Sequence, residues 1–280
     1  MDDHPPAILD AIPTRPLNPP TAMPPAPAPY PGLVEMEFGV PIPGVIVEES
    51  RWARTALKKI PAGILDWPAL FGRTAPVIID MGCGNGRSTL HSAVARPEFD
   101  HLGVDILPVV IRYATRRGNQ RGLTNVRFAV IGGRELLADH VAPHSVAEIH
   151  CYHPQPFYDP REFNRRLITP EFLVTAHRAL LPGGRFYLQT DNPGYWAYMR
   201  SIMPEFFEWS ELSGPWPDAP LGKTRREIMA TSKKLPIFRG VGAARIELSL
   251  EDALAKAARL PPPVFNADRR LRELDREERE

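Results

Sequence analysis

The stretch that decides the fold lies between residues 77 and 86 and reads Val77-Ile78-Ile79-Asp80-Met81-Gly82-Cys83-Gly84-Asn85-Gly86. It has the form of a buried strand that runs directly into a glycine-rich turn. Glycines let the backbone of such a turn approach a ligand closely, because a Cβ would collide there. The spacing is G-x-G-x-G, which differs from the G-x-G-x-x-G of dinucleotide-binding turns. No Gly-Lys-Ser/Thr of a phosphate loop comes after it.

Two carboxylates near this turn indicate the kind of ligand. Asp80 comes just before the turn, and Asp105 ends the next strand candidate, 25 residues later. Asp80 suits the cationic amino-acid end of a ligand without phosphates, and S-adenosylmethionine is such a ligand. An acid at the place of Asp105 accepts hydrogen bonds from ribose hydroxyls in doubly wound folds. In the structural alternative, the turn serves only strand–helix geometry and Asp105 caps the helix near Pro108. The strand–turn–helix context favours the cofactor, and the residues predicted to bind it are Asp80, Gly82, Gly84, Gly86 and Asp105.

Outward from this turn, strand and helix patterns alternate, which predicts βαβ units and a mostly parallel sheet flanked by helices. We therefore expect a Rossmann-like α/β fold of the class I methyltransferase type. The strand candidates are Val77–Asp80, His101–Asp105, Val126–Val130, Ala147–Tyr152 and Arg185–Thr190. The helix candidates between them are Ser88–Ala95, Pro108–Arg117, Arg134–His140 and Pro170–Leu181.

The two ends of the chain differ from the middle. Eleven prolines fall within residues 1–31, and each fixes φ and removes a backbone donor. We expect residues 1–45 to form a proline-rich, largely disordered extension, and a short helix over Glu48–Lys59 to lead into a methyltransferase domain over residues 46–250. Residues 251–280 form a charged C-terminal helix or tail, since eleven of the thirteen residues from 268 onward are charged. This tail is expected to be solvated and to carry no chemistry.

The composition excludes several classes of protein. The 34 Lys and Arg balance 33 Asp and Glu, so the chain lacks the basic excess of proteins that coat nucleic acid. The two cysteines are far apart, and neither a membrane-spanning run nor a signal peptide is evident. We expect a cytoplasmic protein without a membrane partner, and the oligomeric state stays open. His150 and His153 flank Cys151, but no third ligand stands at a suitable spacing, so no metal is expected.

The later segments resemble the bacterial tRNA (guanine-N7)-methyltransferases over about Pro76 to Gly240. In that family the fourth strand leads into Pro-Asp-Pro-Trp and a basic stretch ending in Arg-Arg; here the run begins Pro154-Gln155-Pro156-Phe157 and ends at Arg165-Arg166. The segment from Phe186 to Asn192, which contains most of the fifth strand, is similar to the family's Ala-Thr-Asp-Trp segment. Tyr195-Trp196-Ala197-Tyr198-Met199 is similar to its Tyr-Ala-x-x-Met helix, and Thr224-Arg225-Arg226-Glu227 to its Thr-x-Phe-Glu motif.

The resemblance implies S-adenosylmethionine-dependent N7-methylation of a guanine in tRNA. It implies catalytic roles for Gln155, Asp191 and Glu227. It implies acceptor binding by Arg165, Arg166, Asp191, Thr224 and Glu227. Apart from the resemblance, Tyr195, Trp196 and Tyr198 either stack on a base or pack their helix onto the sheet. The best basic patch in the chain, which either contacts RNA or is a solvated face, consists of Lys223, Arg225, Arg226, Lys233 and Lys234.

The departures from the family pattern leave other functions open. Gln155 replaces the aspartate associated with catalysis, and Gly132 stands where an acid usually contacts the adenine side of the cofactor. Met229-Ala230 replaces the Arg-Gly after Thr-x-Phe-Glu, and Arg161 is the only base between Phe157 and Arg165. The alternatives are a divergent relative that methylates another RNA or a small molecule, and a non-catalytic binding protein that keeps the fold.

Overall fold

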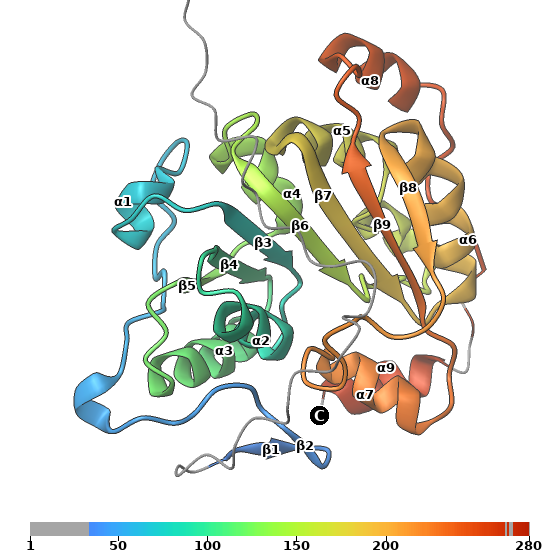
Figure 1. Cartoon of the computed structure of the whole chain (residues 1–280). Helices are drawn as coiled ribbons and strands as arrows, with labels where there is room; N and C mark the ends of the chain where they lie inside the picture. Colours follow the sequence, from blue (N-terminus) through green and yellow to red (C-terminus); the bar gives the residue numbers. More distant parts are fainter. Residues whose placement is uncertain (1–33, 267, 269–270, 280) are drawn as a thin grey trace, which may run out of the picture.

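A computed structural model describes residues 34–266, 268 and 271–279. Its core is a seven-stranded sheet with the order β5-β4-β3-β6-β7-β9-β8 (Figure 1). The first five strands of this sheet along the chain run parallel to one another. The last strand along the chain, β9, pairs antiparallel with both of its neighbours, β7 and β8. The Rossmann-like class I methyltransferase fold predicted from the alternating pattern is confirmed. The strands are β3 (Val77–Met81), β4 (Asp100–Asp105), β5 (Val126–Val130), β6 (Val146–Tyr152), β7 (Leu180–Thr190), β8 (Phe207–Leu212) and β9 (Phe238–Ala244).

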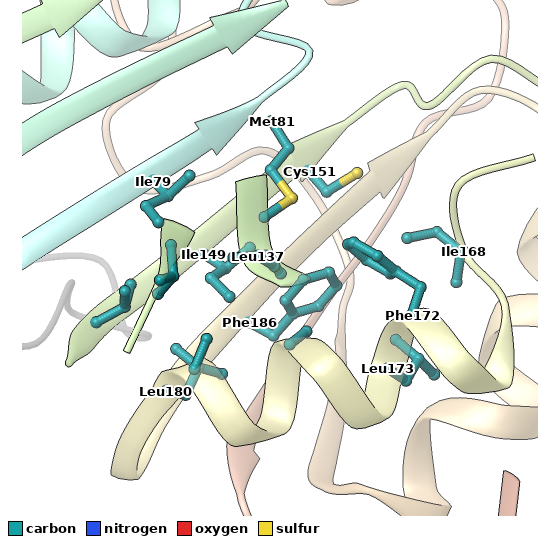
Figure 2. Close-up of a cluster of buried hydrophobic side chains, with 14 of the residues drawn as sticks. Ile79, Met81, Leu137, Ile149, Cys151, Ile168, Phe172, Leu173, Leu180 and Phe186 are labelled. Atoms are coloured by element: carbon teal, nitrogen blue, oxygen red, sulfur yellow. The ribbon is translucent and has the colours of Figure 1, made fainter. Parts of the chain in front are cut away.

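Helices cover both faces of the sheet because each helix has one apolar side to bury. On one face Leu90 and Ile111 pack with Phe128 of β5. On the other face Phe172 and Leu173 of α5 meet side chains of the central strands (Figure 2). The helices are α1 (Trp67–Phe71), α2 (Arg87–Ala95), α3 (Pro108–Gln120), α4 (Gly133–Glu135), α5 (Pro170–Ala179), α6 (Pro193–Ile202), α7 (Arg225–Ser232), α8 (Leu250–Ala257) and α9 (Leu271–Arg279), with short turns η2 (Glu49–Arg51), η3 (Leu136–His140), η4 (Pro160–Arg165) and η5 (Met203–Glu205).

The position of β3 decides where a ligand can bind. From β3 the chain builds β4 and β5 on one side and then returns to build β6 and β7 on the other. In open α/β sheets the crevice lies at the carboxyl ends of the strands where this order reverses. The segments after β3 and β6 are neighbours at that edge, since Met81 pairs with Cys151 in register. The glycine turn and the loop that contains Gln155 therefore share one crevice.

The N-terminal expectations need correction. The helix expected over Glu48–Lys59 is only the single turn η2. Residues 34–45, expected to belong to a largely disordered extension, include a hairpin of β1 (Met36–Glu37) and β2 (Val40–Pro41). Glu35 in this segment forms ion pairs with Arg117 and Arg121 of the α3 region. The expected disorder of the proline-rich residues 1–33 lies outside the described residues.

The C-terminal segment ends in a charged helix, but one side of that helix is buried and not solvated as expected. Helix α8 packs on α5, and α9 packs on α7 (Figure 1). Leu271 and Leu274 of α9 are buried, because leucines three positions apart on a helix lie on one face. Within the part of the chain that the structure describes, no helix combines the length and apolar character needed to cross a membrane.

Candidate functional site

The glycine turn after β3 leaves open space at two of its three glycines. Gly82, Gly84 and Gly86 all have positive φ, at 72°, 54° and 80°, which L side chains adopt only with strain. A Cβ added at Gly82 or Gly84 would meet no atom within 4 Å, whereas one at Gly86 would lie 2.7 Å from the Cβ of Ala114. Gly86 is therefore required for packing against α3, and Gly82 and Gly84 give a ligand room to approach.

Two acids border this space. Asp80 is buried and accepts a hydrogen bond of 2.6 Å from the Thr89 hydroxyl; burial raises its pKa. Asp105 accepts from the backbone N–H of Gly84 at 3.1 Å and of Leu107 at 3.0 Å. Because Leu107 precedes the first residue of α3, Asp105 both fixes the glycine turn and stabilises the start of that helix. Each carboxylate oxygen of Asp105 keeps a further lone pair for a ligand.

The loop after β6 is held in a strained shape. His153 and Phe157, which flank Pro154-Gln155-Pro156, have positive φ of 54° and 41°. Such conformations cost about 1–3 kcal/mol each and persist only where the surroundings impose them. The backbone N–H of His153 donates to the carbonyl of Gln189 at 2.6 Å, and the Arg166 guanidinium donates to the carbonyls of Pro156 and Phe157. This frame leaves Gln155 exposed at the edge of the crevice.

Asp191 and Glu227 lie together in a buried polar network, and both are paired. Asp191 accepts from the Arg226 Nε at 2.8 Å and lies 3.3 Å from the His153 Nδ1. Glu227 accepts from the Gln189 Nε2 at 3.0 Å and from Arg239 at 2.6 Å. Burial raises the pKa of Asp191, but the neighbouring His153 and Arg226 outweigh it and hold that pKa below its usual range. Asp191 is thus held in its ionised form by its basic neighbours, and the Glu227 carboxylate is occupied by hydrogen bonds from Gln189 and Arg239.

The comparisons with known proteins give this site its context. The family model described as "Putative methyltransferase" matches residues 74–239. The tRNA (guanine-N7)-methyltransferase of Halorhodospira halophila is 31% identical over 167 residues, which cover 60% of this chain and 72% of that protein. The chain belongs to the tRNA (guanine-N7)-methyltransferase family.

The part of a relative's length that this chain covers differs among members of the family. The tRNA (guanine-N7)-methyltransferase of Mycobacterium ulcerans is 38% identical over 139 residues, and this chain spans only 49% of that protein. The solved structure of the 16S rRNA methyltransferase KamB is similar in fold, with a TM-score of 0.50 and 16% identity over 65% of this chain and 94% of that one. At that identity the likeness concerns the fold alone.

The cofactor of the family, S-adenosylmethionine, fits the residues around the glycine turn. Asp80 and Asp105 offer carboxylates, and Gly82 and Gly84 offer space. Next to them the carboxyl ends of β4 and β5 expose apolar side chains, with Ile106 at 59% and Val130 at 46% exposed. An adenine ring needs such an apolar surface. Gly132 provides no carboxylate for the adenine side of the cofactor. A Cβ at this position would make an ordinary contact with Ile106, at 3.9 Å.

The two arginines predicted to bind the acceptor differ in role. The guanidinium of Arg166 is buried, also donates to the carbonyl of Pro263, and lies between the rings of Phe163 and Phe265 at 3.7 and 3.6 Å. It therefore cannot contact phosphate, and the prediction for Arg166 is corrected: this residue holds the loop. Arg165 is exposed, pairs with Glu162 along η4 and lies over the ring of Phe157 at 4.8 Å, so it stays a candidate.

The aromatic residues of α6 and the threonine before α7 have structural roles. Tyr195, Trp196 and Tyr198 are buried, and the Tyr195 hydroxyl accepts from the backbone of Ile168, so these aromatics pack α6 against the sheet. Thr224 is the N-cap of α7, where its hydroxyl accepts from the Glu227 backbone at 3.0 Å. This geometry is that of a capping residue, a role that the Thr-x-x-Glu pattern also predicts.

His150 contacts the buried Glu148 at 2.9 Å. Among the described residues, no group of three His, Cys, Asp or Glu side chains is arranged to hold a metal ion.

Sequence reasoning missed several residues that assemble the site. The buried Arg87 donates to the carbonyls of Lys223 and Pro41, so it ties the start of α2 to the segment before α7 and to the N-terminal hairpin. An arginine in the first turn of a helix is unfavourable for the helix dipole. Its presence there could have indicated that Arg87 has another role. The role of Arg226 in holding Asp191 had a signal as well, since an arginine stands at the phenylalanine of the family's Thr-x-Phe-Glu motif.

Proposed function

We propose that this chain methylates N7 of a guanine in tRNA, in the cytoplasm, with S-adenosylmethionine as methyl donor. The observation that carries the proposal is the strained loop of residues 153–157, held by Arg166 beside the glycine turn. Strain of this kind is concentrated at functional sites. The loop occupies the position of the family's Pro-Asp-Pro-Trp segment, and its exposed tip is Gln155.

The paired acids favour an acceptor that loses no proton. In N7 methylation the lone pair of N7 attacks the methyl carbon, the carbon–sulfur bond breaks, and its electrons stay on sulfur. The sulfonium charge passes to the guanine ring and no proton leaves N7. A site for this reaction needs alignment and electrostatic support rather than a general base. Asp191 and Glu227, each bound to an arginine, suit such a site, whereas hydroxyl or exocyclic amine acceptors require proton removal.

The chain's own residues then act by position. The Gln155 amide can bond to a guanine edge, and the paired side chains of Asp191 and Arg226 hold His153, two residues before Gln155, in place. For the RNA backbone we propose Arg165 and Lys234, which are both exposed. Phosphate contacts supply a large share of RNA affinity and make it sensitive to salt.

The test is methyl transfer from radiolabelled S-adenosylmethionine to unmodified tRNA, followed by separation of the digested nucleosides. Label in 7-methylguanosine is expected. A matched tRNA transcript that contains 7-deazaguanosine in place of guanosine lacks the N7 lone pair and should accept no label. Label in any other nucleoside overturns the assignment to N7. No label, in protein that binds the cofactor by calorimetry, overturns tRNA as the acceptor.

A further inference from the structure

Helix α9 lies outside the residues that the family model matches, yet it packs on α7 beside the acceptor site (Figure 1). Leu274 of α9 is 1% exposed and packs in a cluster with Met229 and Ala230 of α7. Asp275 is also buried, at 7% exposed. A charged residue with so little exposure needs a partner. The helix is therefore seated by an apolar contact and a buried charge together.

The residues of α7 that receive α9 are those at which the chain departs from the family pattern. Arg226 replaces the phenylalanine of Thr-x-Phe-Glu, and Met229-Ala230 replaces the Arg-Gly after that motif. Met229 and Ala230 form the apolar seat for Leu274. Arg226 donates to the Asp275 carboxylate at 2.5 Å. One docked helix thus gives a single physical reason for departures at three positions.

Asp275 begins a line of buried polar contacts that ends at the acceptor loop. The Nε of Arg226 donates to Asp191 at 2.8 Å, and its Nη1 donates to Asp275 at 2.5 Å. The other oxygen of Asp191 lies 3.3 Å from the Nδ1 of His153, two residues before Gln155. The side chains of Asp275, Arg226 and Asp191 are all 9% exposed or less.

A second contact joins α9 to the same loop. Arg272 lies over the ring of Tyr158 at 5.1 Å. Burial raises the pKa of the Tyr158 hydroxyl, and the charge of the nearby Asp275 raises it further. Tyr158 comes directly after Phe157, the last residue of the strained segment. Asp275 therefore lies near two groups: Arg226, which is bonded to Asp191, and Tyr158, which follows the loop of residues 153–157.

We propose that Asp275 is a positioning residue for the acceptor site, which acts through Arg226 on Asp191 and His153. A planar guanidinium held by carboxylates at two of its nitrogens has a fixed orientation. With Asp275 removed, Arg226 loses one of the two carboxylates that orient its guanidinium, and the alignment of Asp191 and His153 is weakened. The proposal rests on the proposed function for its effect on catalysis, but the orientation of Arg226 is measurable without any methyl acceptor.

The experiment compares Asp275→Ala with Glu277→Ala. Glu277 lies on the same helix, and its ion pair with Lys233 is exposed at 40% and 49%. For Asp275→Ala we expect kcat on tRNA to fall about 10-fold or more, since small misplacements in an active site carry penalties of this order. KM for S-adenosylmethionine should be unchanged, and Asp275→Glu should recover most of kcat. Glu277→Ala should keep kcat within about twofold, as exposed ion pairs contribute little.

A spectroscopic readout separates this proposal from the proposed function. In arginine-labelled protein, the Arg226 Nε–H signal is expected to be protected from exchange, because it is bonded to buried Asp191. It should lose protection in Asp275→Ala and keep it in Glu277→Ala. Protection retained in Asp275→Ala overturns the positioning role, whether or not tRNA is the acceptor. If Asp275→Ala does not fold, the isosteric Asp275→Asn gives the same two measurements.

The kinetic measurements also test the positioning role of Asp275. An unchanged kcat in folded Asp275→Ala overturns the proposal while tRNA methylation stands. A rise in kcat or in tRNA affinity also overturns the proposal. It would mean that the acidic residues of α9 cover the basic residues Arg226 and Lys233. If wild-type protein transfers no methyl group to tRNA, the proposed function fails and the Arg226 signal alone tests the role of Asp275.

Discussion

Gln155 carries an amide at the position where the family motif has an aspartate, and it is exposed at the tip of a fixed loop. An amide can bond to guanine but cannot balance the positive charge that develops on the ring. We expect Gln155→Asp to raise kcat on tRNA by about 10²-fold, the typical effect of one such electrostatic group. Single-turnover methyl transfer measures the change. The control is Asp159→Asn, which keeps its capping oxygen in the same loop and should leave kcat unaltered. A fall in kcat for Gln155→Asp would instead assign Gln155 to another acceptor.

Asp191 and Glu227 illustrate what a motif leaves undecided at the level of single residues. The resemblance predicted both acids near the acceptor, and the structure brings both into one buried network. Asp191 is paired with Arg226 and Glu227 with Arg239. Arg239 lies in β9, a strand that the sequence patterns did not predict. Only the packed molecule therefore shows that these two candidate site acids are partners of arginines.

At the level of elements, the loop of residues 153–157 depends on Arg166 rather than on its own sequence. Arg166→Ala leaves three buried carbonyl oxygens without their donor, and we expect it to lower the free energy of unfolding by about 2–4 kcal/mol. Arg165→Ala removes an exposed ion pair and should change stability by less than about 0.5 kcal/mol. Urea denaturation of the two variants measures both values.

The same pair of variants separates structure from acceptor binding. Arg165→Ala should raise KM for tRNA and reduce its dependence on salt, because one phosphate contact is lost. A KM unchanged by Arg165→Ala removes Arg165 from the acceptor surface. If Arg166→Ala and the wild type have the same free energy of unfolding, Arg166 does not hold the loop.

Strand β9 shows why some elements escaped prediction. Its sequence, Phe-Arg-Gly-Val-Gly-Ala-Ala, contains two glycines and little of the β-branched character typical of strands. A Cβ at Gly240 would lie 2.1 Å from the Trp209 ring, and one at Gly242 would lie 2.5 Å from Phe207. The glycines make room for aromatic side chains of β8 beside it. This requirement exists only once the two strands are paired, so no local pattern expresses it.

For the molecule as a whole, the buried His101 predicts a loss of stability in acid. Burial, with smaller contributions from the charges of Arg96 and His150, lowers the pKa of His101 from 6.5 to about 3. The unfolded chain therefore binds this proton more readily, and stability is lost as pH falls from 6.5 toward 3. The linkage relation gives a loss of about 2 kcal/mol between about pH 7 and pH 5.

Denaturation at the two pH values measures this contribution. His101→Gln does not titrate and keeps a polar side chain near Ser92, the partner of the histidine ring at 2.9 Å. The wild type should lose about 2 kcal/mol more than His101→Gln over this pH interval. Equal losses in the two proteins would mean that His101 takes up a proton while folded.

By itself the sequence determined the Rossmann-like fold, the glycine turn with Asp80 and Asp105, and the family. Strand and helix periodicity, turn glycines and ordered motifs are written in consecutive residues, so they can be read without a structure. The tertiary structure alone decided that Arg166 is buried, that Asp191 and Glu227 are paired, and that α9 closes on the site. These facts depend on contacts between distant residues, such as Arg226 and Asp275 at a separation of 49 positions. The free energy of a buried charge is set by the partners that folding brings to it, and the local sequence does not contain them.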